Sequence, residues 1–136
     1  MRIERSTVMN TKQYRQLMRP SEKSIQSEVI GWLRAHGYYV MRINSGKYAV
    51  GEGTSRRFVM GAEAGTPDVL AFQGYQCGVC EGEDYDGDCS TELLFVEVKK
   101  PGNHPTFLQE QKMKELEEHG ARCIVVHSVV ELEEKI

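Results

Sequence analysis

The spacing of hydrophobic residues along the 136-residue chain predicts alternating helices and strands. An apolar stripe at 3.6-residue spacing predicts a helix that is capped by Ser21 or Ser24 and ends at about Gly37. This stripe consists of Ile25, Val29, Trp32 and Leu33. Short runs rich in branched and aromatic residues predict strands. The expected strands are residues 38–43, 56–60, 69–72, 93–98 and 121–127.

Two further helices are expected in the C-terminal half. Thr106 is a plausible N-cap for a helix ending at Gly120, and residues 129–135 could form a short final helix. The main order α-β-β-β-β-α-β predicts an α/β fold with a mixed sheet flanked by helices. Residues 1–20 are interpreted as a basic arm. Residues 21–136 are interpreted as one domain, with a Cys- and acid-rich insertion at 73–92.

The net charge of −3 is unevenly distributed along the chain. Residues 73–92 contain six acids and no Lys or Arg, so the rest of the chain carries +3. The first 20 residues contain five basic groups against Glu4. A mildly basic domain with a basic N-terminal segment can attract phosphates, although a solvated tail explains the charge of the first 20 residues equally well. With no apolar stretch of membrane-spanning length and no signal-like N-terminus, a cytoplasmic protein without a membrane partner is expected.

Glu97 and Lys99 are unusual because they lie at the end of the most apolar strand. Residues two apart in a strand point to the same face, so these two side chains should project together. Asp68 follows Pro67 at the start of another apolar strand. If the two strands are neighbours, the two carboxylates can converge on one divalent cation, which would activate a water as nucleophile. An exposed acid–base pair and an ordinary turn are the alternatives.

Helix geometry selects between neighbouring polar residues. Glu22 falls at the edge of the apolar stripe and Glu28 lies further from it, so Glu22 is better placed to reach an inward-facing site. Glu22 is equally explained as a first-turn acid favoured by the helix dipole. In the second helix, Gln109 shares a face with Met113, whereas Gln111 is rotated away. Gln109 is therefore expected to face the same site, where it would contact a metal-bound water or, if the substrate is a phosphodiester, the scissile phosphate. A polar residue flanking the helix core is the alternative.

Five sequence elements in order resemble the VRR-NUC family of the PD-(D/E)XK nuclease superfamily. They are Ser21-Glu22, Arg42-Ile43-Asn44-Ser45-Gly46, Gly65-Thr66-Pro67-Asp68, Glu97-Val98-Lys99-Lys100-Pro101-Gly102 and Thr106-Phe107-Leu108-Gln109. The resemblance covers about residues 21–127 and implies a restriction-endonuclease-like fold.

The resemblance also implies a Mg²⁺- or Mn²⁺-dependent endonuclease that acts on DNA. Asp68, Glu97 and the Val98 carbonyl would be metal ligands, Lys99 would be the catalytic lysine, and Glu22 matches a family position. Stand-alone relatives look like Holliday junction resolvases, so a homodimer acting on branched DNA is expected, in the cytoplasm or, if phage-encoded, in the host cytoplasm. The alternatives are a catalytically weak DNA-binding module on the same fold, and an interaction protein that acts through its acidic loop.

Two further groups of residues are candidates for binding. Basic residues near the matching elements could hold the DNA backbone, or could be solvated surface. They are Arg42, Lys47, Arg56, Arg57 and Lys100. The insertion contains Cys77, Cys80 and Cys89, which could start a structural zinc site, with Cys123, His104 or another chain supplying a fourth ligand. A flexible acidic loop with reduced thiols is the alternative.

Overall fold

A computed structural model describes residue 11, residues 19–74 and residues 91–136. Cys77, Cys80 and Cys89, with most of the 73–92 insertion and most of the 1–20 arm, lie outside the described residues, so the zinc prediction stays a prediction. Among the described helices, none combines the length and apolar character needed to cross a membrane.

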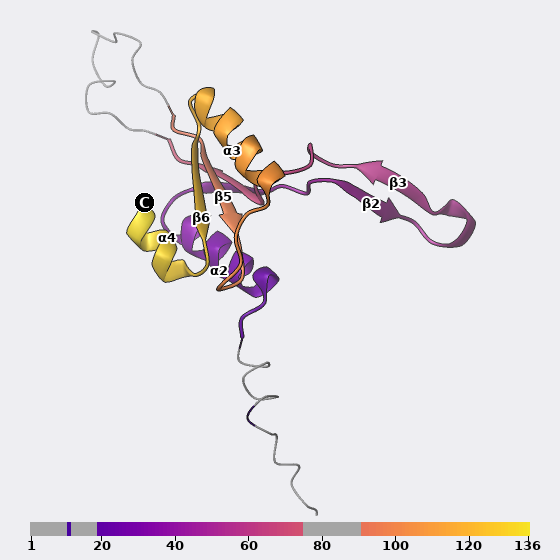
Figure 1. Ribbon diagram of the computed structural model, residues 1–136, viewed down its shortest axis with the longest axis horizontal. Coiled ribbons are helices and arrows are strands. Elements are labelled where there is room, and N and C mark those ends of the chain that lie inside the picture. Colours follow the sequence, from indigo (N-terminus) through magenta and orange to yellow (C-terminus); the bar gives the residue numbers. More distant parts are fainter. Residues whose placement is uncertain (1–10, 12–18, 75–90) are drawn as a thin grey trace, which may run out of the picture.

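The described elements form a mixed α/β fold (Figure 1). They are α2 (Glu22–Ala35), β1 (Tyr39–Arg42), β2 (Lys47–Val50), the 3₁₀ turn η1 (Gly53–Ser55), β3 (Arg57–Met60), β4 (Val69–Phe72), β5 (Leu94–Val98), α3 (Phe107–Glu118), β6 (Arg122–Val126) and α4 (Val129–Lys135). The prediction of a mixed sheet flanked by helices is therefore confirmed. The predicted order lacked β2, whereas the short final helix expected at residues 129–135 is confirmed as α4.

The main sheet has the strand order β1-β4-β5-β6. The β1–β4 and β4–β5 pairs are antiparallel, and the β5–β6 pair is parallel, with α3 as the connection between those two strands. All five residues of β5 are buried. This agrees with a strand that is covered on both faces, as a crossover helix requires.

The two faces of β5 have different surroundings. Leu94, Val96 and Val98 belong to the hydrophobic core, which α2 and α4 complete with residues such as Leu33 and Leu132. The intervening side chains, including Glu97, project toward α3 on the other face, because side chains alternate along a strand. The candidate carboxylates therefore lie on the α3 face of the sheet.

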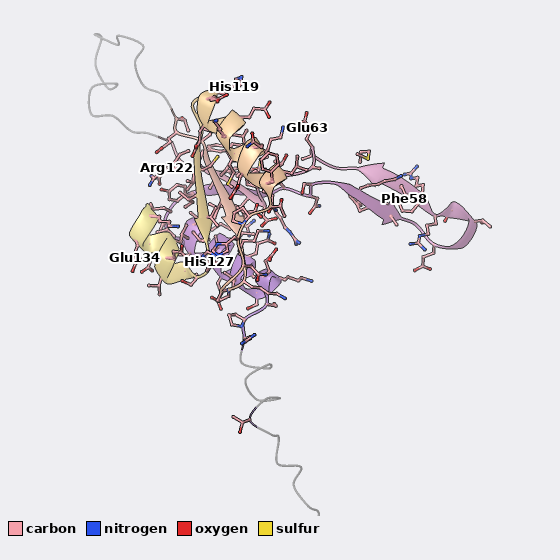
Figure 2. All side chains as sticks on the ribbon, viewed as in Figure 1. Phe58, Glu63, His119, Arg122, His127 and Glu134 are labelled. Atoms are coloured by element: carbon pink, nitrogen blue, oxygen red, sulfur yellow. The ribbon has the colours of Figure 1, made fainter. Side chains whose placement is uncertain are left out.

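Strands β2 and β3 form a separate antiparallel ribbon that projects from the body (Figure 1). Strand β2 was not predicted, whereas the strand expected at residues 56–60 is present as β3, although it lies in this ribbon and not in the main sheet. Among the described strands, β3 pairs with β2 alone, and nearly all of the ribbon's side chains are exposed, among them Phe58 (Figure 2). A ribbon with no buried face leaves no hydrophobic alternation that distinguishes it from a loop.

Two glycines hold the base of this ribbon close to the body. Gly65 has φ +86°, and a Cβ there would lie 2.8 Å from the Leu108 carbonyl oxygen at the start of α3. A Cβ at Gly61 would collide with the Asn44 carbonyl oxygen, which accepts a hydrogen bond from Ala62. These backbone contacts fix the segment that leads into Asp68 against both α3 and the residues following β1.

Candidate active site

Strand pairing brings Asp68 and Glu97 together. The β4–β5 register pairs Val69 with Val96, and continuing it by one residue places Asp68 opposite Glu97. The Val98 N–H donates a hydrogen bond to Asp68 Oδ2 at 3.2 Å. The expectation that the two carboxylates come from neighbouring strands is therefore confirmed by the topology.

Lys99 forms an ion pair with the carboxylate of Glu97. Lys99 Nζ lies 3.1 Å from Glu97 Oε1, and the Glu97 side chain is 1% exposed. Val96 and Val98 point into the core on the opposite face. The predicted division of this strand into an apolar face and a face carrying Glu97 and Lys99 is confirmed.

Gln109 connects the first turn of α3 to the same carboxylate. Its Nε2 donates to Glu97 Oε1 at 2.7 Å, and its Oε1 accepts from the Thr106 N–H at 2.9 Å. The Gln109 N–H in turn donates to Thr106 Oγ1 at 3.3 Å, completing a capping box. Gln111 is exposed, so the choice of Gln109 as the inward-facing glutamine is confirmed. Its expected contact with a metal-bound water or a phosphate stays a prediction.

One oxygen of Glu97 has no protein partner. Among the described residues, Glu97 Oε2 is the buried side-chain polar atom that lacks a hydrogen bond. Such an atom is costly unless something satisfies it. Burial first, and then the negative charge of Asp68, raise the pKa of Glu97 to about 7, although Lys99 opposes the rise. This carboxylate therefore carries an unsatisfied acceptor in a negatively charged environment.

Asp68 and Glu22 share this environment. Burial and the charge of Glu22 raise the pKa of Asp68, against the opposing effects of the Val98 N–H, Lys99 and Arg42. Glu22 also raises the pKa of Glu97, so it lies close enough to act on both carboxylates. Glu22 is half-buried, whereas Glu28 is exposed. The choice of Glu22 as the helix acid nearest the site agrees with these positions.

The donor set fits a divalent cation bound mainly by oxygen. No group of three His, Cys, Asp or Glu within the described part of the chain is arranged to hold a metal ion. The pair Asp68 and Glu97, with a backbone carbonyl as third ligand, does not depend on such a group. Two neighbouring carboxylates with raised pKa values and one unpartnered buried oxygen form a set that a cation would neutralise.

The candidate DNA-binding residues divide into two groups. Arg42 lies close enough to Asp68 to lower its pKa, and Lys100 directly follows Lys99; both are exposed. The other three residues lie on the ribbon or beside its turn. Lys47 Nζ is 4.8 Å from the centre of the Phe58 ring, whereas Arg56 and Arg57 adjoin the turn at the far end. The latter two would therefore meet DNA well away from the carboxylates.

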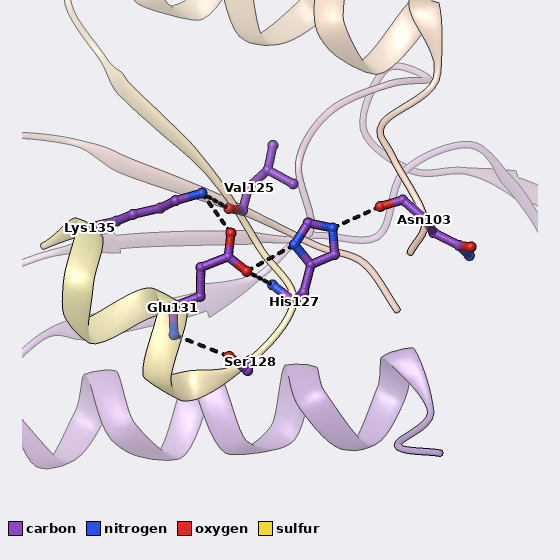
Figure 3. Close-up of polar contacts among 6 residues, drawn as sticks. All are labelled: Asn103, Val125, His127, Ser128, Glu131 and Lys135. Atoms are coloured by element: carbon purple, nitrogen blue, oxygen red, sulfur yellow. Dashed lines mark hydrogen bonds and ion pairs between the residues drawn. The ribbon is translucent and has the colours of Figure 1, made fainter. Parts of the chain in front are cut away.

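A second polar network, at the C-terminus, was missed in the sequence (Figure 3). Glu131 Oε2 accepts from the backbone N–H of His127 at 2.8 Å and contacts His127 Nδ1 at 2.9 Å. Glu131 Oε1 lies 2.8 Å from Lys135 Nζ. His127 Nε2 contacts the Asn103 carbonyl oxygen at 2.8 Å. The network thereby ties α4 to the loop between β5 and α3. The i, i+4 spacing of Glu131 and Lys135 was the available sequence signal.

Comparisons with protein-family models, with curated proteins and with solved structures found no match.

Proposed function

We propose that this protein is a metal-dependent endonuclease that hydrolyses phosphodiester bonds in DNA. The observation that carries the proposal is the buried, unpartnered Oε2 of Glu97 beside Asp68 and Lys99. A purely structural ion pair would gain nothing from a second carboxylate or from an orphaned oxygen. A site that binds a cation and a phosphate uses both the second carboxylate and the unpartnered oxygen. The nuclease-like fold and the family resemblance belong to the same proposal.

Asp68, Glu97 and the Val98 carbonyl would hold Mg²⁺ or Mn²⁺, which prefer oxygen ligands. When bound, such an ion lowers the pKa of a coordinated water and stabilises negative charge on a phosphoryl oxygen. The raised pKa values of both carboxylates indicate that the charged site is unfavourable even with Lys99 beside it, so a further positive charge would stabilise it. Because a bound cation would favour the charged forms of both carboxylates, the pH dependence that these pKa values produce can be used to test for the ion.

The remaining residues have roles defined by their contacts. Lys99 places an ammonium group at the carboxylate, where it can orient the attacking water or stabilise charge on the phosphate. Gln109 holds Glu97 in place through its Nε2 and is a positioning residue. Glu22 adds negative charge close to both carboxylates.

The resemblance favours branched DNA as substrate, with four-way junctions foremost, and a homodimer whose two sites make symmetric cuts. Arg42 and Lys100 are placed to bind phosphates beside the cut, and Lys47 would bind the backbone at the base of the ribbon. Arg56 and Arg57 would bind it further along an arm of the DNA. A cytoplasmic location, including the cytoplasm of a phage-infected host, is part of this proposal. The alternative is a DNA-binding module on the same fold with little cleavage.

Cleavage of labelled four-way junction, flap and linear duplex DNA in Mg²⁺ or Mn²⁺ tests the proposal. We expect the wild type to cut branched DNA in a metal-dependent way and Lys99→Ala to be strongly impaired. Identical behaviour of the two proteins would contradict the enzyme proposal. Retained binding of branched DNA without cleavage by the wild type would favour the binding-module alternative.

A further inference from the structure

A surface depression opens directly beside Asp68, on the side of the ribbon. Its volume is about 440 Å³, within the ~300–1,000 Å³ range of small-ligand sites. It is lined by Gln26 of α2, residues 42–45, Tyr48 of β2 and Asp68. A group bound in this depression would therefore lie next to the proposed catalytic carboxylates and at the base of the ribbon.

The lining combines the chemical groups that recognise a nucleotide. Arg42 is exposed and supplies a guanidinium, which binds phosphate oxygens. Gln26 and Asn44 carry amides, which can both donate to and accept from base edges. The ring of Tyr48 is available for stacking on a base, since this residue is 42% exposed. Among the described residues, Asp68 is the one acid that lines the depression.

We infer that this depression receives one unpaired nucleotide of the DNA next to the scissile phosphate, with Tyr48 stacked on its base. The inference rests on the proposed function and names the feature by which a structure-selective enzyme would choose its substrate. A base inside a duplex has both faces covered by its neighbours, so it must leave the stack to meet Tyr48. That cost is smallest for a base that is already single-stranded, as in a flap, and it is lower at a branch point, where stacking is interrupted, than inside a duplex.

The ribbon supplies a matched control for Tyr48. Tyr48 pairs with Val59 and Ala49 pairs with Phe58, so the Tyr48 and Phe58 rings project from opposite faces of the ribbon. Phe58 is 63% exposed and does not line the depression. Phe58→Ala therefore removes an exposed aromatic ring from the same ribbon without altering the depression.

The test measures DNA binding in EDTA, so that cleavage is not required. The probes are a flap DNA carrying 2-aminopurine at its first unpaired position and a fully paired duplex of equal length. We expect Tyr48→Ala to weaken flap binding by between about five- and a hundredfold, the range for loss of one base–aromatic stack. It should also abolish the 2-aminopurine fluorescence change and leave duplex affinity within about twofold. Tyr48→Phe should restore flap binding. Phe58→Ala should keep the wild-type ratio of flap to duplex affinity, because any effect through Lys47, whose Nζ lies 4.8 Å from that ring, would act on both probes alike.

Several outcomes would overturn the inference. One is equal flap binding by wild type and Tyr48→Ala; another is an equal loss in Phe58→Ala, which would indicate general contact with the ribbon. A third is weakened self-association of Tyr48→Ala in native mass spectrometry with unchanged discrimination between probes, which would assign Tyr48 to a protein interface. A wild type that binds neither probe and cuts no DNA would refute the proposed function as well. Metal-dependent cleavage with no effect at Tyr48 would refute this inference alone.

Discussion

Glu97 and Glu131 are both carboxylates paired with a lysine, yet their pKa values move in opposite directions. Both oxygens of Glu131 have partners in the chain. Partial burial opposes the change, but hydrogen bonds from Lys135 and His127 lower its pKa to about 2. Glu97 is almost fully buried, has one oxygen without a partner and faces Asp68, and its pKa rises to about 7.

The difference separates two uses of the same residue type. A carboxylate whose partners are all supplied by the chain contributes to the stability of the fold. A carboxylate with an unused oxygen and a like-charged neighbour is held at a cost, which is typical of sites that bind or react. The same substitution, Glu→Gln, at Glu97 and at Glu131 should therefore have different effects.

The largest expected difference is in cleavage. Glu97→Gln should lower the rate on a four-way junction in Mg²⁺ by about 10²–10³-fold, comparable with the loss of one group that stabilises transition-state charge. The cleavage rate of Glu131→Gln should stay within about threefold of the wild-type rate, because its network does not contact Asp68 or Glu97. Single-turnover rates on labelled junctions measure both, and equal losses in the two variants would remove the distinction.

The next difference is in the pH dependence of stability without metal. The folded pKa of Glu97 is raised above its ordinary value, so the stability it contributes is full below about pH 4.5 and is lost as pH rises through 7. We expect the wild type to lose up to about 3 kcal/mol relative to Glu97→Gln between pH 4.5 and 8. Urea unfolding in EDTA across this range measures the loss. Parallel pH profiles for the two proteins would contradict it.

A third difference is in stabilisation by Mg²⁺ or Mn²⁺. At pH 8 the ion should raise the unfolding free energy of the wild type by ~1.4 kcal/mol at ten times its Kd and by ~2.7 kcal/mol at a hundred times. Glu97→Gln should lose most of this gain, whereas Glu131→Gln should keep it. Thermal melts with metal and with EDTA provide the measurement, and a gain of the same size in Glu97→Gln would place the ion elsewhere.

The smallest expected effect is on stability at the C-terminal network. Glu131→Gln should lower the unfolding free energy by about 1 kcal/mol, since its ion pairs are partly exposed. The pKa of Glu131 is lowered, so its contribution is lost as pH falls from about 4.5 toward 2. The hydrogen bond to Asn103 and the proximity of Glu131 raise the pKa of His127. The stability that His127 contributes is therefore lost as pH rises above about 6.5. If the loss of unfolding free energy in Glu131→Gln did not vary with pH, it would not arise from this network.

The sequence predicted those features that depend on local periodicity. The alternation in residues 94–98 assigned Glu97 to one face and Val98 to the other, and helix spacing separated Gln109 from Gln111. The ribbon could not be found in this way, since β2 and β3 are defined by pairing with each other and bury no face. The C-terminal network depends on where His127 meets Glu131 and on the return of the chain to Asn103, a separation of 24 residues.

Gln109 uses one side chain for two elements, since its Oε1 caps α3 and its Nε2 holds Glu97. Opening of the first turn of α3 would therefore deprive Glu97 of a hydrogen-bond donor in the same event. Helix ends open locally at low free energy. The backbone N–H of Gln109 donates to Thr106 Oγ1 in the closed turn, so its proton would exchange with solvent in that open state. The exchange rate of a single helix-end amide would thus report how much of the time the carboxylate is held in place.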